Sequence, residues 1–572
     1  MNMTKVLGLT CTANVGSDRK AARMGQRSSR ACGIGASKSR VAICASGFAA
    51  LALLLFFGQS APLAAQEPAR DSKQAEAKSG EAKAGEAKPA ESKEPGTPKE
   101  ESSVTDHTLR LGAQTIPYKA AASTTLLKDE KDEPTALLFS IAYTRSDVKD
   151  ASTRPVAFIY NGGPGSSSVW LHMGAFGPRR VVTANAQPTP PPPYKVADNN
   201  DCLLDKTDMV FIDPVGTGYS HPVGKGQGKD FWGVDQDVRS LAQFILTWVT
   251  RNNRWNSPKF LMGESYGTFR SAALANYLHQ HDHMDMNGIV LISSVLDAGT
   301  LAFNVGNDMP YVFYLPSYSA AAWVNKRLSN RPDNLEAFLK EARQFASTEF
   351  ADALMRGSHL TDAEKADLAK KLSRFTGLSE DYLIKANLRV RLSQFQAELE
   401  RAKGLTTGRY DARFTGPTYD LLTEHAAYDP SYTAVAGAFT AAINSYLRED
   451  LKFKSDRTYE ILSNEPGRNW DWKHSAPGRG EYFPGSPNVE EDLIAALMFS
   501  PNLQVQVENG YFDMATPFFA TEYTMDHLLL PKDLRSRIHL EYYTAGHMMY
   551  LNDADHEKLA ASVRAFVDSA SK

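Results

Sequence analysis

The chain has 572 residues, of which 42% are hydrophobic, 10% aromatic and 23% charged. This apolar fraction excludes a mainly disordered protein, and the length suits one large domain with an insertion or two to three ordinary domains. Residues 1–65 carry a net charge of +7 and the remaining residues −10. The acidic body argues against nucleic-acid binding, which needs clustered Lys and Arg.

The first 65 residues have the order of a secretory signal peptide. Residues 1–40 are basic, residues 41–57 contain no charge, and residues 58–65 end in small side chains. The long basic part leaves Met24 open as the true start. The alternative is an uncleaved anchor, because 17 apolar residues are at the short limit for a membrane span. We expect a secreted or periplasmic protein, with no stable membrane partner unless the signal stays uncleaved.

Residues 66–103 are predicted to form a disordered linker. They are nearly all Ala, Glu, Lys, Pro, Ser and Gly, so they cannot bury a core of their own. The alternative for this segment is a charged, solvated helix. Beyond the linker Cys202 is the only cysteine, which excludes a disulfide framework. It stands in a polar loop with no candidate base beside it, so we do not expect it to be a nucleophile.

From residue 104 onward, predicted strands alternate with predicted helices. A helix is indicated where Val234, Val238, Leu241 and Ile245 recur at helical spacing. Alternating strands and helices favour a mostly parallel α/β sheet, divided here between residues 104–299 and 491–572. The strands are expected over 107–111, 136–144, 156–160, 209–212, 259–262, 288–292, 503–507 and 538–543.

Between residues 300 and 490 the pattern changes from strands to charged amphipathic helices. Helical patterns cover residues 335–347, 362–372 and 381–403, and strand patterns are missing. Because strands resume at residue 503, we interpret this region as a mainly helical cap inserted into the sheet domain.

The pentapeptide Gly263-Glu-Ser-Tyr-Gly is the first motif that carries chemistry. It stands between the predicted strand 259–262 and a helical run over 269–279, which is the G-x-S-x-G arrangement of a nucleophile elbow. The elbow is so tight that only residues without a Cβ fit on either side of the serine. The context predicts Ser265 as a nucleophile of an α/β-hydrolase fold.

A serine hydroxyl needs a base to take its proton, and in this fold the acid and the base follow in the order Ser, Asp, His. Asp513 follows the strand 503–507 and His547 follows the strand 538–543. Both therefore lie at the carboxyl edge of the sheet, where ligands bind. His539 within a strand and His556 within a helix are the competing bases, and both are interpreted as structural.

A second glycine-rich element, Asn161-Gly-Gly-Pro-Gly-Ser-Ser-Ser, follows the strand 156–160. This is where α/β-hydrolases hold their second oxyanion donor. It is not a phosphate-binding loop, because it has no Gly-Lys-[Ser/Thr] ending. A plain tight turn would explain the segment alone, but not together with the serine elbow.

Together these motifs resemble the serine carboxypeptidases. The resemblance is carried by residues 161–167, 208–220, 263–267 and 546–548 and by Asp513, and it covers roughly 130–300 and 495–570. It implies an α/β-hydrolase fold with a helical insertion and hydrolysis of peptides that have a free C-terminus.

The resemblance also implies residue roles. The triad would be Ser265, His547 and Asp513, and the oxyanion would be bound by the backbone N–H groups of Gly163 and Tyr266. The substrate's terminal carboxylate would be bound by Asn161, Gly162 and Glu264. Apart from the resemblance, Met548 is a further candidate to line the pocket, the alternative being a plain core residue, because Met is common in cores. A carboxyl binds a carboxylate only when one of the two is protonated, so cleavage is expected to be fastest at mildly acidic pH.

The chain departs from the family at informative positions. Ser166 stands where the family has a cysteine, and Ile159 where it has a tryptophan. A second carboxylic acid, which the family has two residues before a Gly-Pro, aligns with Ala175. Half of the acid pair for carboxylate recognition is therefore missing.

Three classes of function remain open on the sequence. The first is an exported serine carboxypeptidase, the second is another serine hydrolase or an acyltransferase, favoured by Ala175, and the third is a non-catalytic binding protein. No cofactor and no metal are expected. His279, His281 and His283 suggest a metal site only weakly, because i,i+2 spacing does not put ligands on one helix face.

Overall fold

The computed structural model of the protein describes residues 98–475 and 486–572. The predicted signal peptide and residues 66–97 of the predicted linker lie outside the described residues. Within the described ranges, no helix combines the length and the apolar character needed to cross a membrane.

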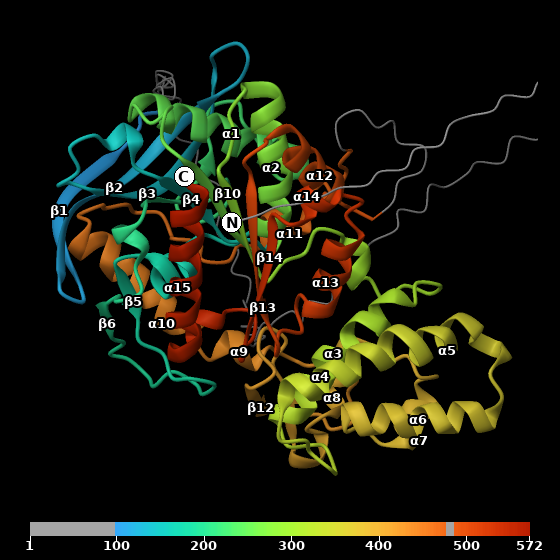
Figure 1. The fold of residues 1–572 in the computed structure, drawn as a ribbon. Helices are drawn as coiled ribbons and strands as arrows, with labels where there is room; N and C mark the ends of the chain where they lie inside the picture. Colours follow the sequence, from blue (N-terminus) through green and yellow to red (C-terminus); the bar gives the residue numbers. More distant parts are fainter. Residues whose placement is uncertain (1–97, 476–485) are drawn as a thin grey trace, which may run out of the picture. The chain divides into compact units, whose positions relative to one another are not determined.

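The centre of the fold is one sheet in the order β1-β2-β3-β7-β4-β9-β10-β13-β14, with β8 paired to β3 (Figure 1). Neighbours from β7 to β14 run parallel, whereas β1, β2, β3 and β7 pair antiparallel. The strands are β1 Ser102–Leu111, β2 Gln114–Lys128, β3 Pro134–Arg145, β4 Val156–Tyr160, β7 Asp208–Ile212, β8 His221–Pro222, β9 Lys259–Glu264, β10 Gly288–Ile292, β13 Gln504–Gly510 and β14 Ile538–Tyr543. A separate pair is formed by β5 Arg179–Val181 and β6 Val196–Asp198.

This sheet confirms the predicted α/β-hydrolase architecture in its parallel part. The N-terminal part differs, because β2 has no counterpart among the predicted strands. The first strand also begins earlier than predicted, so Ser102 and Ser103 of the predicted linker belong to β1.

Helices cover both faces of the sheet, and apolar side chains fill each interface. One face is covered by α1 Val234–Arg251, α2 Tyr266–Asp282 and α12 Glu490–Phe499, the other by α10 Ala436–Ser445 and α15 Asp553–Ala570. The prediction for α1 is confirmed: Val234, Val238, Leu241 and Ile245 are buried. Two Asp side chains in its first turn complement the helix dipole.

The described part of the chain between β10 and β13 contains many helices, and its first part, residues 311–412, forms a third apolar cluster with α13, Phe518–His527 (Figure 1). The helical pattern over 381–403 does not give one helix, because Asn387 and Leu388 have φ of 53° and 63° and end α7. The region also contains a short hairpin of β11, Leu405–Thr407, and β12, Thr415–Pro417, which the sequence pattern did not indicate. The elements are α3 Met309–Val324, α4 Leu335–Phe345, α5 Ala351–Arg356, α6 Asp362–Thr376, α7 Glu380–Lys385, α8 Leu392–Glu398, β11 Leu405–Thr407, β12 Thr415–Pro417, α9 Pro430–Thr433, α10, and α11 Asn464–Arg468; α13 Phe518–His527 and α14 Lys532–Arg535 follow β13.

The strand order reverses between β4 and β9. From β4 the chain crosses to β7 on one side and then returns to β9 on the other side of β4. In parallel sheets such a reversal opens a crevice at the carboxyl ends of the two strands, where ligands bind. The glycine-rich segment follows β4 and the serine elbow follows β9, so both motifs lie at this crevice.

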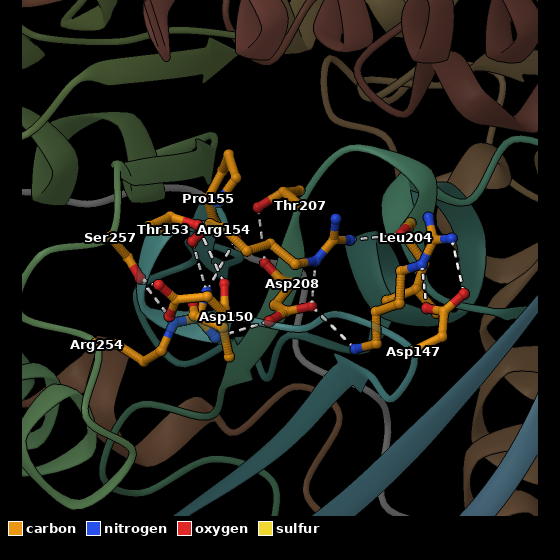
Figure 2. Close-up of polar contacts among 12 residues, drawn as sticks. Asp147, Asp150, Thr153, Arg154, Pro155, Leu204, Thr207, Asp208, Arg254 and Ser257 are labelled. Carbon is orange, nitrogen blue, oxygen red and sulfur yellow. Dashed lines mark hydrogen bonds and ion pairs between the residues drawn. The ribbon is translucent and has the colours of Figure 1, made fainter.

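A buried ion-pair network lies at the amino ends of β4 and β7, opposite the crevice. Asp208, at the start of β7, accepts from Arg154 Nε and from Arg254 Nη1, both at 2.7 Å (Figure 2). The Asp208 side chain is 1% exposed and that of Arg254 is 3% exposed. Arg254 also donates to the carbonyl oxygen of Arg154 at 2.6 Å, so the network joins β7 to the chain entering β4.

Replacing Asp208 by Ala is expected to lower the free energy of unfolding by about 3–5 kcal/mol, because two buried guanidinium groups lose their counter-ion. Urea denaturation measures this change. The control is Asp106→Ala, which breaks an exposed pair with Lys119 and is expected to cost less than about 1 kcal/mol. Equal costs for the two variants would contradict a stabilising role for the network.

Candidate active site

Ser265 occupies a strained turn between β9 and α2. Its backbone has φ of 60° and ψ of −128°, a conformation that non-glycine residues rarely adopt. Its N–H donates to the carbonyl oxygen of Ile292, the last residue of β10, at 2.9 Å. This is the geometry of a nucleophile elbow, which holds the serine at the carboxyl edge of the sheet.

Asp513 and His547 form a buried hydrogen-bonded pair. Oδ2 of Asp513 lies 2.7 Å from Nδ1 of His547, and the two residues are 0% and 2% exposed. Oδ1 of Asp513 accepts from the N–H groups of Ala515 at 2.7 Å and Thr516 at 3.0 Å. The Thr516 hydroxyl donates to Oδ2 at 2.7 Å. The carboxylate is therefore held by three donors in addition to the imidazole.

The histidine loop and the serine elbow are tied to the same end of β10. Ile292 accepts the N–H of Ser265, and the next residue, Ser293, donates its hydroxyl to the carbonyl oxygen of His547 at 2.8 Å. Two hydrogen bonds on adjacent residues thus join the two loops. Burial lowers the pKa of His547, but the negative charges of Asp513 and Glu264 outweigh it and leave the pKa raised.

The glycine-rich loop after β4 lies directly against the elbow. A Cβ on Gly162 would overlap the backbone nitrogen of Tyr266, so this close approach requires glycine. Gly163 follows with φ of 104°. The N–H of Tyr266 is the first of α2, and the first N–H groups of a helix have no partner within it. The loop and the helix start therefore bring together the two predicted oxyanion residues.

Asn161 and Glu264 form a second buried pair beside the elbow. Nδ2 of Asn161 donates to Oε1 of Glu264 at 2.9 Å, and Oδ1 accepts from the N–H of Leu171 at 3.1 Å. These two bonds define the orientation of the amide. Arg270, buried with Asp237, donates to the carbonyl oxygen of Asn161 at 2.6 Å. Burial raises the pKa of Glu264 to about 7.

The other histidines singled out in the sequence lie outside this cluster. Nε2 of His556 donates to the carbonyl oxygen of Ala175 at 2.7 Å, and His539 lies within β14. Nδ1 of His279 pairs with Asp285 at 2.7 Å. Met548 is buried in an apolar cluster next to the sheet. Burial raises the pKa of Cys202 to about 12, so its thiol is not ionised at neutral pH.

Sequence reasoning missed the segment 409–411, which lies in the inserted region and contacts both loops of the Asp–His pair. The carbonyl oxygen of Tyr410 accepts the N–H of His547 at 2.6 Å, and Oδ2 of Asp411 accepts the N–H of Gly546 at 3.2 Å. The carbonyl oxygen of Arg409 accepts the N–H of Met514 at 3.0 Å. No local motif marks this segment, because its role depends on where the insertion returns to the sheet.

Comparisons with known proteins show which proteins this chain resembles. The family model for serine carboxypeptidases matches residues 119–400. The pheromone-processing carboxypeptidase KEX1 of Saccharomyces cerevisiae is 24% identical over 238 residues, which are 39% of this chain and 31% of that protein. The serine carboxypeptidase-like 22 protein of Arabidopsis thaliana is 20% identical over 399 residues, 68% of this chain and 73% of that protein. The match to KEX1 thus spans about a third of its length.

The fold has a solved counterpart. The crystal structure of Kex1(delta)p, a prohormone-processing carboxypeptidase from Saccharomyces cerevisiae, aligns with a TM-score of 0.50 and 17% identity. The alignment covers 79% of this chain and 91% of that one, and shows that the two share a fold. Over residues 119–400, just under half of its length, the chain thus matches the serine carboxypeptidase family, and the relatives and the solved structure that it resembles are carboxypeptidases or carboxypeptidase-like proteins.

Proposed function

We propose that the protein is an exported serine carboxypeptidase, which hydrolyses the C-terminal residue of peptides through a Ser-His-Asp triad and an acyl-enzyme. The observation that carries this proposal is the buried Asp513–His547 hydrogen bond, tied through the end of β10 to the elbow of Ser265. An aspartate on Nδ1 leaves Nε2 free to accept the proton of a serine hydroxyl.

In the proposed reaction, Ser265 attacks the carbonyl carbon of the last peptide bond and His547 takes its proton. The Asp513 carboxylate stabilises the imidazolium that forms. The N–H groups of Gly163 and Tyr266 bind the oxyanion, each contributing about 3 kcal/mol in the transition state. His547 then protonates the leaving amine, and water attacks the acyl-enzyme to regenerate Ser265.

The Asn161–Glu264 pair supports recognition of a free C-terminus. Asn161 has an amide N–H to offer, and a protonated Glu264 can donate to a carboxylate. Gly162 allows the loop to pass close to the elbow, which keeps this pair beside the nucleophile. Met548, next to His547, is proposed to line the same pocket.

Two measurements separate this proposal from its alternatives. A fluorophosphonate probe is expected to label Ser265, and an unlabelled Ser265 would leave only a non-catalytic binding protein. Peptides with a free C-terminus are expected to be cleaved much faster than the same peptides with an amidated C-terminus. Equal turnover would favour another serine hydrolase or an acyltransferase, the alternative that Ala175 supports.

The pH dependence is expected to follow Glu264. Above pH 7 Glu264 loses its proton and repels the substrate's carboxylate, so KM rises with pH. At lower pH His547 becomes protonated and kcat falls. Because the pKa of His547 is raised above its ordinary value, kcat/KM is expected to peak close to neutral pH, and not at the mildly acidic pH that the resemblance suggests. In Glu264→Gln the amide donates without titrating, and KM is expected to stay constant above pH 7. Steady-state kinetics across pH 5 to 9 measure this.

The matched control for Glu264→Gln is Glu508→Gln. Burial raises the pKa of Glu508 to about 7 as well, but this carboxyl accepts from Tyr543 and takes no part in the proposed site. Its substitution is expected to leave the pH profile unchanged. A Glu264→Gln enzyme that still needed acid to bind substrate would contradict the assigned role.

Export is proposed on the order of charges and apolar residues in residues 1–65. N-terminal sequencing of the protein secreted from its host is expected to begin near residue 66. A mature protein that retains residues 41–57 would instead be anchored by its signal.

A further inference from the structure

Tyr550 carries a buried hydroxyl that the proposed reaction does not use. It stands three residues after His547, and its side chain is 1% exposed. Among the described residues, its hydroxyl forms no well-aligned hydrogen bond. Leaving a buried hydroxyl unpaired costs free energy, so such a group calls for an explanation.

The groups that surround this hydroxyl belong to the proposed carboxylate site. Tyr550 interacts with the carboxyl of Glu264 and with the amide of Asn161. Asn161 bonds to Oε1 of Glu264, whereas Oε2 has no hydrogen bond to any residue of the described ranges. One unused donor and one unused acceptor are therefore neighbours in a buried space, beside the residue that precedes Ser265.

The backbone makes room for the ring of Tyr550 at this place. A Cβ on Gly174 would lie 2.7 Å from Cε2 of Tyr550, so a larger residue would displace the ring. The next residue is Ala175, where the family resemblance implies a second acid and this chain has a methyl group. The resemblance thus implies that Glu264 has no acidic partner at position 175, and it interacts with the Tyr550 hydroxyl instead.

We propose that Tyr550 is a positioning residue for Glu264: its hydroxyl donates to Oε2 of the ionised carboxyl and sets the pH above which the substrate's carboxylate is no longer bound. This inference rests on the proposed function. A hydrogen bond of the same kind occurs elsewhere in the core, where the Tyr543 hydroxyl donates to Oε2 of the buried Glu508 at 2.8 Å.

The electrostatic effect of Tyr550 on the pKa of Glu264 is in the direction that the proposal requires. Tyr550 and Asn161 stabilise ionised Glu264, as does a protonated His547, and these oppose the upward effect of burial and of Asp513 on its pKa. Burial also raises the pKa of Tyr550 well above its ordinary value, so its hydroxyl keeps its proton throughout the working range. Only Glu264 then titrates within the carboxylate site, and removal of the Tyr550 hydroxyl should raise its pKa.

Binding measured without turnover tests this. The dissociation constant of a blocked dipeptide with a free carboxylate is determined by calorimetry from pH 5 to 9 in Ser265→Ala and in Ser265→Ala/Tyr550→Phe. In the parent the constant should be flat at low pH and rise about tenfold per pH unit above the pKa of Glu264. Tyr550→Phe is expected to move the onset of this rise upward by about one pH unit, a tenfold change in proton affinity.

The matched control is Tyr543→Phe, which removes the hydroxyl from the Tyr–Glu pair outside the site and should leave the onset unmoved. Labelling of Ser265 by the fluorophosphonate in single Tyr550→Phe shows that this variant is folded. If Tyr550→Phe leaves the pH at which the dissociation constant begins to rise unchanged or lowers it, or if it weakens binding equally at every pH, the inference about Tyr550 is wrong while the proposed function stands. A parent that binds the dipeptide and its amide equally overturns the proposed function as well.

Discussion

Ser265→Ala is expected to lower kcat by about six orders of magnitude, because alanine leaves the elbow after β9 without its proposed nucleophile. Residual hydrolysis would come from the oxyanion donors and from substrate positioning alone. Binding of a free-acid peptide should persist, since Asn161 and Glu264 remain. Single-turnover kinetics with a free-acid peptide measure the chemical step, and calorimetry measures the retained binding.

The control is Ser319→Ala. Ser319 is fully buried, and its hydroxyl donates to the carbonyl oxygen of Leu315 within α3. Its kcat is expected to match the wild type. If the Ser265→Ala protein still hydrolysed the peptide and still reacted with the fluorophosphonate, the nucleophile would have to be another residue.

The parallel part of the fold could be predicted because its strands are short, continuous apolar runs bounded by turn residues. β2 was missed for the opposite reason. Its middle, Ala120-Ala121-Ala122, has low strand propensity and no large alternating side chains, and it is held in the sheet by pairing with β1 and β3. Tertiary pairing of this kind is not visible in a local pattern.

The insertion shows the same limit. The charged pattern over 381–403 is helical by composition, yet the chain turns at Asn387 and Leu388 to bring the following hairpin back toward the sheet. No proline or glycine marks this break in the sequence. Positive φ at a leucine is a cost that only tertiary contacts offset, so it could not be predicted locally.

Within the site, the sequence predicted the contact between Asp513 and His547, because residues after neighbouring parallel strands meet at one edge. Their catalytic roles stay a prediction. Thr516 could have been found, since a threonine three residues after an aspartate often bonds to it. The role proposed for Tyr550 could not be predicted, because it depends on the space that Gly174 and Ala175 leave for its side chain.

Asp513→Asn is expected to lower kcat about 10⁴-fold while the fold is retained. The surroundings of Asp513 decide how the new amide must lie. Oδ1 accepts two backbone N–H groups, from Ala515 and Thr516, so the amide oxygen must take that position. The amide nitrogen then faces Nδ1 of His547 and donates to it. This holds the proton of the neutral imidazole on Nε2, which can no longer accept the proton of Ser265.

A second buried Asp–His pair provides the control. Oδ2 of Asp492 lies 2.8 Å from Nε2 of His474, next to α1 and outside the proposed site. Asp492→Asn makes the same chemical change there and is expected to leave kcat unaltered. The rate of fluorophosphonate labelling should fall with kcat in Asp513→Asn and stay constant in Asp492→Asn. If both variants lost activity together with thermal stability, Asp513 would be a structural residue, and orientation of the imidazole would have to come from Thr516, whose hydroxyl lies 3.2 Å from Nδ1.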